Sequence, residues 1–139
     1  MSVVDLFQHW AYTHPDAARV GANCDRTWAE LWQRFLPDAD WSGMEDIRAA
    51  GWQRKIHIFS DPFYYIEYGL AQLGALQVWQ HARRDPVGAV NSFRRALARG
   101  GTEDLRTLYQ LADTELIFDR EPLQRLVDDV MVRIVELSA

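Results

Sequence analysis

Apolar residues along most of the chain recur at spacings of three and four, the period of one face of an α-helix. The first such run covers residues 3–11 and ends before Pro15, so it predicts a first helix. A second helix is expected between Asp25, a residue type that caps helices, and Pro37, which closes the run. Its inner face carries two tryptophans and is strongly aromatic.

The stretch between Ser42 and Phe59 shows two patterns in succession. Ser42 and Glu45 have the spacing of a capping box and predict a short third helix that runs to Gly51. Apolar and polar residues then alternate, so we expect residues 52–59 to be extended or irregular.

The longest helix is expected over residues 63–83. Asp61 supplies an N-cap and Pro62 a first-turn proline. Because this segment is apolar on nearly every side, we expect it to be the central buried helix. Its most apolar part, residues 64–79, is interrupted by Glu67, glutamines and two glycines, so it falls short of the roughly 20 apolar residues that a membrane span needs.

Three further helices are expected in the C-terminal part. Asp85 and Pro86 repeat the cap-then-proline start, and this helix stops at Gly100 and Gly101. Thr102 is expected to cap the next helix. The last helix carries its apolar residues on one stripe: Leu123, Leu126, Val127, Val130, Met131, Ile134 and Leu137.

Together these elements predict an all-α fold, a helical bundle of about six to seven helices in a single domain over residues 1–139. A tetratricopeptide solenoid is the rival fold, because residues 89–101 look like the second helix of such a repeat. That architecture needs the pattern to return at a period of about 34 residues. Nothing at that offset reproduces it, which disfavours the solenoid.

Composition excludes several classes of function. The chain carries 15 Lys and Arg against 20 Asp and Glu, a net charge of −5, and offers no basic footprint for nucleic acid. Its single cysteine, Cys24, cannot form an internal disulfide, and the N-terminus lacks a signal segment. We therefore expect a cytoplasmic protein with no membrane partner. Cys24 has no clear basic neighbour beyond Arg26, which disfavours a catalytic thiol.

Residues 52–79 concentrate the groups that can do chemistry. His57 is followed by Tyr64, Tyr65 and Tyr68, and spacings of three and four put Tyr68 on a common helical face with both earlier tyrosines. Converging phenol and imidazole donors can bond a peptide carbonyl and then the oxyanion that forms when water attacks it. In the alternative interpretation the tyrosines fill the core with their hydroxyls bonded to backbone. Spacing alone does not decide between the two.

Four runs of sequence resemble the last part of oligoendopeptidase F enzymes, which belong to the thimet oligopeptidase family. They are DLFQHWAYTHPD, DWSGMEDIR, KIHIFSDPFYYIEYGLAQLGALQVW and the ALARGG that ends at Gly101. The runs stand in the family's order and span nearly the whole chain. The resemblance implies the C-terminal segment of an all-helical, gluzincin-type catalytic domain that cuts short peptides in a deep channel with one zinc ion.

The zinc site of that family is an HExxH helix completed by a glutamate on a later helix. No such motif occurs among these 139 residues. The four histidines, His9, His14, His57 and His81, include no pair at i, i+4, and none is followed by glutamate. The resemblance begins downstream of the metal motif, so we expect this chain to hold no zinc of its own and to be inactive alone.

What the resemblance leaves is the family's substrate-binding wall. The pattern K-x-H followed by tyrosines is also similar to the substrate-binding segment of angiotensin-converting enzyme, a related gluzincin. By that similarity His57 would bond a substrate carbonyl, Tyr68 would stabilise the oxyanion, and Tyr65, or Tyr64 in its place, would help to fix the peptide. Lys55 matches a group that holds a terminal carboxylate, a contact that an endopeptidase does not need.

Two functions follow as hypotheses. The chain is either a segment of a zinc metalloendopeptidase that binds short peptides and joins a missing zinc-site half, or a non-catalytic helical module that binds peptides or proteins. A chain cut from a larger helical domain would expose apolar faces. We therefore expect a homodimer or higher oligomer whose contact uses Val3, Phe7, Trp10 or the face of residues 64–68.

Overall fold

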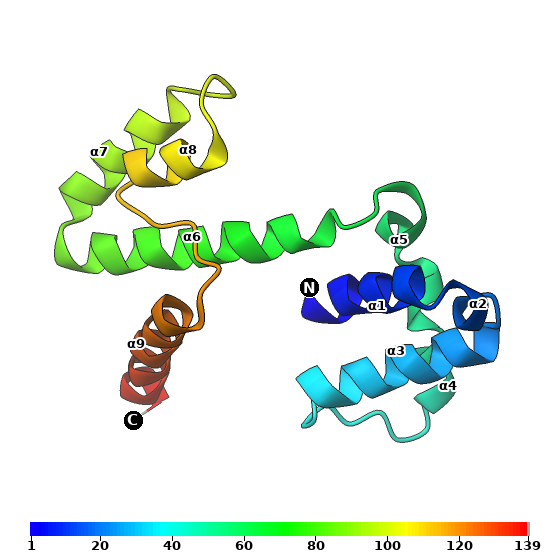
Figure 1. The fold of residues 1–139 in the computed structure, drawn as a ribbon. Coiled ribbons are helices and arrows are strands. Elements are labelled where there is room, and N and C mark those ends of the chain that lie inside the picture. The colour runs from blue at the N-terminus through cyan, green and yellow to red at the C-terminus, as the bar shows by residue number, and fades with distance from the viewer. Residues whose placement is uncertain (139) are drawn as a thin grey trace. The chain divides into compact units, whose positions relative to one another are not determined.

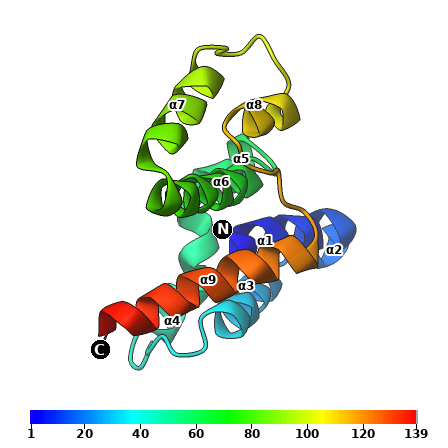
Figure 2. The same cartoon turned by 90° about the vertical axis from the view of Figure 1, so that its left-hand side faces the viewer.

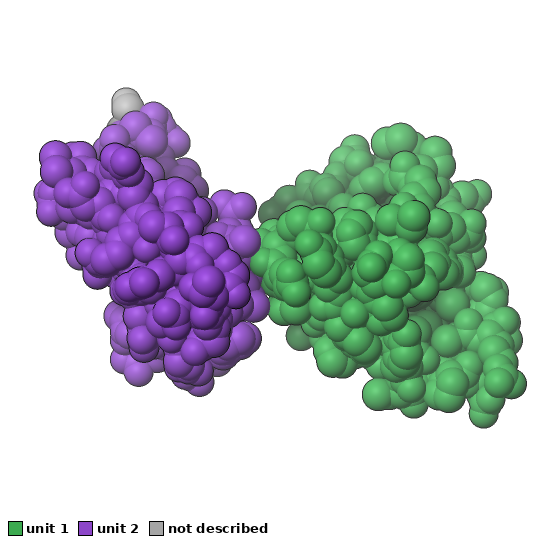
Figure 3. Space-filling view, turned by 90° about the horizontal axis from the view of Figure 1, so that it is seen from above, with its two compact units in different colours: residues 1–69 green, residues 70–139 purple. Residues whose placement is uncertain are grey.

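The computed structural model describes residues 1–138, and every regular element within them is helical (Figure 1). This part of the chain forms nine α-helices and one 3-10 turn, and three of the helices, α2, α4 and α5, have five residues or fewer. The predicted all-α class is confirmed. The chain divides into two compact units, Met1–Gly69 and Leu70–Ala139 (Figure 3). The expectation of a single domain stays a prediction.

Unit 1 is built around an aromatic core. Helices α1 (Ser2–Thr13) and α3 (Gly21–Phe35) pack on each other and are joined through the short α2 (Pro15–Ala18). Phe7 and Trp28 meet edge to face, with ring centroids 5.3 Å apart, an arrangement that the quadrupoles of the two rings favour. The first helix is confirmed as the sequence predicts it.

The burial of Val3 and Phe7 bears on one expectation about association. Their side chains are only 7% and 2% exposed, because both belong to the core that α1 and α3 form within one chain. Neither residue can reach a second molecule while this unit stays folded. Of the residues expected in an oligomer contact, Val3 and Phe7 thus offer almost no surface, and an oligomer that uses Trp10 or the face of residues 64–68 stays a prediction.

The start of α3 also differs from the prediction. The helix begins at Gly21 rather than after Asp25, whose carboxylate instead accepts a hydrogen bond from the Trp52 indole N–H at 2.8 Å. Beside it, Gly51 lets the backbone approach Trp28, since an added Cβ would lie 2.9 Å from the indole nitrogen. These contacts attach residues 51 and 52 to α3.

The segment from Ser42 to Ser60 is more helical than predicted. Ser42 forms no capping box, because its hydroxyl donates to the Asp40 carboxylate, and α4 (Glu45–Ala49) begins without a side-chain cap. A 3-10 turn (Ala50–Arg54) and α5 (Ile56–Ser60) follow. The expectation of an extended or irregular stretch over residues 52–59 is thus wrong. Trp52 and Ile58 pack against the core from short helical turns, whereas Ile56 and Phe59 stay exposed.

The longest helix, α6 (Tyr65–Arg84), starts later than predicted. Asp61 does not cap it, because its carboxylate accepts from the neighbouring Ser60 hydroxyl, and Phe63 has a φ of +63°, which breaks the helical path. No residue of α6 is buried, so the expectation of a central buried helix is wrong. Its apolar residues face all sides, and the neighbouring elements cover only part of them.

Unit 2 places three helices around the C-terminal part of α6. Helices α7 (Pro86–Leu97) and α8 (Leu105–Leu111) lie on one side of α6, and α9 (Arg120–Ser138) lies on the opposite side (Figures 1 and 2). The Asp85 cap of α7 is confirmed, since its carboxylate accepts from the Gly88 N–H at 2.9 Å. Thr102 does not cap α8; Asp104 does, by accepting from the Thr107 N–H at 2.9 Å.

Polar contacts hold the parts of unit 2 together. The Gln77 side chain pairs with the backbone of Glu115 in both directions, each hydrogen bond 2.8 Å long. The Gln80 amide donates to the Asp129 carboxylate, which ties α9 to α6. The Tyr109 hydroxyl donates to the Leu70 carbonyl at 2.9 Å. Side-chain hydrogen bonds therefore join helix α6 to α8, to α9 and to the segment before α9.

None of the helices within residues 1–138 combines the length and the apolar character needed to cross a bilayer.

Two glycines of α6 give a matched test of this packing. Nothing lies within 4 Å of a Cβ added at Gly69, so Gly69→Ala should raise the free energy of unfolding by about 0.5–1 kcal/mol through helix propensity. A Cβ at Gly74 would lie 3.0 Å from the Tyr109 ring, which its hydrogen bond holds in place. Gly74→Ala should therefore lower the urea midpoint followed by circular dichroism. Equal stabilisation by both changes would contradict the contact between α6 and α8.

Candidate functional site

Four of the five residues that the sequence singles out come together on the surface of unit 1. His57 lies on α5, Tyr64 lies in the turn before α6, and Tyr65 and Tyr68 lie in the first turns of α6. We call His57, Tyr64, Tyr65 and Tyr68 the aromatic cluster. All four residues lie within twelve positions of sequence, so the local chain path alone decides whether they meet.

The ring geometry of the aromatic cluster is close. The His57 ring stacks on Tyr64 at 5.5 Å and meets Tyr65 and Tyr68 edge on, at 5.1 and 6.1 Å. Tyr68 in turn contacts Tyr64 at 5.5 Å and Tyr65 at 5.4 Å, again edge to face. The convergence that the spacing predicts is therefore present, with Tyr68 touching the other three rings. The roles of these residues stay predictions.

The turn at Phe63 puts the cluster together, and sequence reasoning missed this residue. A positive φ at a non-glycine residue costs free energy and persists only where its surroundings hold it. Here the Phe63 ring contacts His9 at 4.9 Å and Tyr12 at 5.2 Å, so α1 holds the turn. No feature of the apolar pattern marks this position, because the strain belongs to the backbone.

Tyr65 anchors the cluster to the interior. It packs, together with Ile58 of α5, against the buried core of α1 and α3. Tyr64 and Tyr68 remain 41% and 45% exposed, so they do not fill the core as the structural interpretation of the tyrosines requires. The two ends of the cluster therefore differ in environment. The Tyr65 ring packs against the core, and the Tyr64 and Tyr68 rings are accessible to a ligand.

A structural tyrosine in the same chain shows the contrast. Tyr109 is half-buried, and its hydroxyl donates a hydrogen bond to the Leu70 carbonyl. Tyr64 and Tyr68 of the cluster are exposed at the surface instead. Partial desolvation by its surroundings, then the neighbouring Tyr64 and Tyr65, raise the pKa of Tyr68 above its usual value. Tyr68 is thus a neutral O–H donor throughout the neutral pH range.

Lys55 lies outside the cluster's aromatic contacts. It is the half-buried residue directly before α5, and no ion pair of its ammonium group is found within residues 1–138. The structure thus brings together four of the five predicted residues and leaves Lys55 at the edge.

The described residues do not fit a zinc ion. Nowhere in residues 1–138 do three His, Cys, Asp or Glu side chains gather closely enough to hold a metal. His9 lies 3.6 Å from Asp5, but this pair has no third ligand beside it. Cys24 is buried, and its thiol donates to the Ala18 carbonyl at 3.2 Å. Burial also raises the pKa of the Cys24 thiol, which makes it a poor nucleophile at neutral pH.

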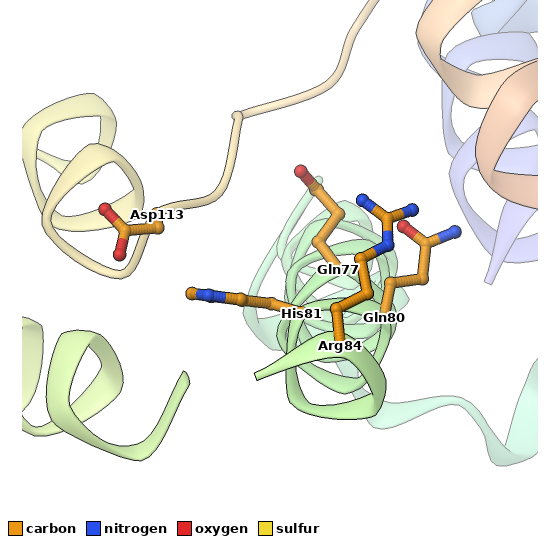
Figure 4. A pocket seen from close by; sticks show the side chains of 5 residues that line it. All are labelled: Gln77, Gln80, His81, Arg84 and Asp113. Carbon is orange, nitrogen blue, oxygen red and sulfur yellow. The ribbon is translucent and has the colours of Figure 1, made fainter. Parts of the chain in front are cut away.

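A polar pocket of about 360 Å³ in unit 2 is a competing site (Figure 4). Gln77, Gln80 and Arg84 line it from α6. The Gln77 amide is bonded to the Glu115 backbone, the Gln80 amide donates to Asp129, and Arg84 lies 3.9 Å from the same carboxylate. Figure 4 shows His81 pointing toward Asp113, which already binds Arg95 at 3.1 Å. Several of the polar groups in this pocket thus hold the helices of unit 2 together, so the aromatic cluster is the better candidate.

Comparison with known families settles the ancestry of the chain. A model of peptidase family M3 matches residues 1–127, which include the aromatic cluster, Lys55, all of unit 1 and most of unit 2. The chain belongs to peptidase family M3. Comparisons of this M3 chain with curated proteins and with solved structures gave no match. The match confirms the resemblance at the level of the family, and the relation to oligoendopeptidase F in particular stays a prediction.

Two tyrosines of the M3 chain test the distinction between structural and exposed phenols. Tyr109→Phe removes the hydrogen bond to Leu70 and should cost about 1 kcal/mol of unfolding free energy. Tyr68→Phe alters an exposed side chain and should change stability by less than about 0.5 kcal/mol. Urea unfolding of both variants checks this. A loss on Tyr68→Phe as large as that on Tyr109→Phe would assign Tyr68 a structural role.

Proposed function

We propose that this M3 chain supplies the substrate-binding wall of a zinc metalloendopeptidase of the oligoendopeptidase F type. The observation that carries the proposal is the aromatic cluster: three phenols and one imidazole in mutual contact, packed at one end and exposed at the other. Family membership gives the chemistry, peptide hydrolysis, in which such donors have a use.

Each cluster residue has a separate task in this proposal. His57 donates to a carbonyl of the bound peptide, and Tyr65 or Tyr64 fixes the neighbouring stretch of the substrate. Tyr68 donates its O–H to the oxygen that gains negative charge when water attacks the scissile carbonyl. Its neutral, raised-pKa phenol keeps the proton that this hydrogen bond requires.

The wall is incomplete as a catalyst. An oxyanion donor is most effective where water is excluded, because the local dielectric constant is then low. Tyr68 is 45% exposed in unit 1, so a further surface has to cover it before it can act strongly. The zinc ion of the family, with its HExxH ligands, would be supplied by that same further polypeptide, whether continuous with this chain or a separate partner.

The alternative function is a helical module that binds peptides or proteins without cutting them. Exposed aromatic rings with hydrogen-bonding tips are well suited to holding a peptide, whether or not a reaction follows. The donor set within the described residues favours this alternative for the chain by itself, since it does not fit zinc.

The chain alone should therefore show no peptidase activity and bind no zinc at a family-like site. Dialysed protein should contain zinc well below one ion per chain by atomic absorption, and a fluorogenic peptide should stay intact. Stoichiometric zinc, together with cleavage that a chelator abolishes, would contradict the proposal.

Joined to an HExxH-bearing M3 half, the Tyr68→Phe variant should turn over substrate roughly 10²- to 10³-fold more slowly, with a smaller change in KM. The reason is that the lost hydrogen bond forms mainly in the transition state. Tyr12→Phe is the matched control, because it removes an exposed phenol of the same unit outside the cluster. Unchanged turnover in Tyr68→Phe would leave only the binding function.

A further inference from the structure

A carboxylate flanks the exposed part of the aromatic cluster. Glu67 lies in the first turn of α6, three residues after Tyr64 and directly before Tyr68, and its side chain is exposed. Its backbone N–H donates to the Tyr64 carbonyl at 3.0 Å, which closes a helical turn and puts residues three apart on one face. Tyr65 lies on a different side and packs against the core. The charge therefore stands beside the two open phenols.

The Glu67 carboxylate is not neutralised by the chain itself. None of the ion pairs found within residues 1–138 involves it. After desolvation and the neighbouring Tyr64 and Tyr65, Glu67 is the further group that raises the pKa of Tyr68, so its charge acts on that phenol. Lys55 is the nearest cation along the chain, and neither it nor another cation of the described residues opposes this effect.

One face of the Tyr64 ring is free of aromatic contacts. His57 stacks on the other face with an interplanar angle of 18°, and the Tyr64 side chain is 41% exposed. The chain pairs cations with rings elsewhere, since Arg34 and Arg83 lie 5.2 and 5.1 Å from the centroids of rings outside the cluster. Within residues 1–138 no Lys or Arg lies over a cluster ring in this way. An open aromatic face with a carboxylate beside it attracts a cation.

Unit 1 as a whole is also acidic. It carries ten Asp and Glu against six Lys and Arg, so most of the chain's net charge of −5 belongs to this unit. A negative surface raises the encounter rate of cationic ligands and disfavours anionic ones.

We propose that Glu67, together with the open face of Tyr64, makes the aromatic cluster selective for peptides that carry a lysine or arginine side chain. The cationic group lies over the Tyr64 ring and pairs with the Glu67 carboxylate, while His57 and Tyr68 remain available to the peptide carbonyls. This selectivity rests on the function proposed above, since it requires that the cluster bind a peptide.

A carboxylate in the first turn of a helix also has a structural use, because it stabilises the positive end of the helix dipole. That effect is the same for every ligand. A difference in affinity between peptides of different charge therefore separates the selective role of Glu67 from the structural one.

Titration of the full chain with a series of short peptides tests the selectivity. The peptides have equal length and acetylated and amidated ends, and they differ at one central residue, which is Lys, Met or Glu. Followed by the ring NMR signals of the cluster, the Lys peptide should bind about 3- to 10-fold more tightly than the Met peptide, which is unbranched and neutral, and the Glu peptide should bind most weakly.

Variants of two acidic residues assign the effect. Glu67→Gln should bring the Lys peptide to the affinity of the Met peptide. Glu30→Gln is the matched control, because it removes an exposed carboxylate of the same unit on α3, and it should keep the preference.

The outcomes separate this selectivity from the proposed function. Equal affinities for the Lys and Met peptides, tighter binding of the Glu peptide, or a preference that survives Glu67→Gln would overturn the selectivity and leave peptide binding in place. A preference lost equally in Glu30→Gln would also overturn it, because the net charge of the unit would then be the cause. Peptides that shift none of the cluster signals would overturn the selectivity and the proposed function together.

Discussion

The packing of Tyr65 against the buried core of unit 1 is the contact on which the candidate site depends. Tyr65 belongs both to the surroundings of the Phe7 and Trp28 core and to the aromatic cluster, so one side chain transmits the position of α1 and α3 to the site. Without that contact, the start of α6 would be held to the unit only by the Phe63 ring against α1 and by exposed ring contacts with His57. The distance between His57 and Tyr68 would then depend on their own ring contact and on Tyr64.

The strained turn at Phe63 is the second feature that positions the aromatic cluster. A positive φ there breaks the helical path between α5 and α6, and contacts with His9 and Tyr12 hold the residue in that state. The histidine from α5 and the tyrosines from α6 can meet because the turn is tight. The N-terminal helix thus supports a site to which it contributes no predicted site residue, which gives a structural reason for its place in the matched part of the M3 family.

The sequence predicts the helices and the contacts within one or two helical turns well. It predicts several helix starts and the burial of α6 poorly. The helical class, the Asp85 cap of α7 and the meeting of the tyrosines all follow from spacing that acts within one or two turns. Caps failed where the side chain bonds another group. Asp25 binds the indole of the distant Trp52, while Ser42 donates to the nearby Asp40 and Asp61 accepts from its neighbour Ser60. The prediction that α6 is buried failed because an apolar helix is buried only if other elements surround it. The sequence of the helix itself does not determine how many elements pack around it.

Ring NMR signals of the tyrosines, observed while a short peptide is titrated into the protein, test the central claim most directly. The account predicts that Tyr64, Tyr65 and Tyr68 shift together with the His57 ring, while Tyr109, whose hydroxyl is bound to Leu70, stays unchanged. Shifts that are absent from the cluster, or that are as large at Tyr109 as at Tyr68, would contradict it.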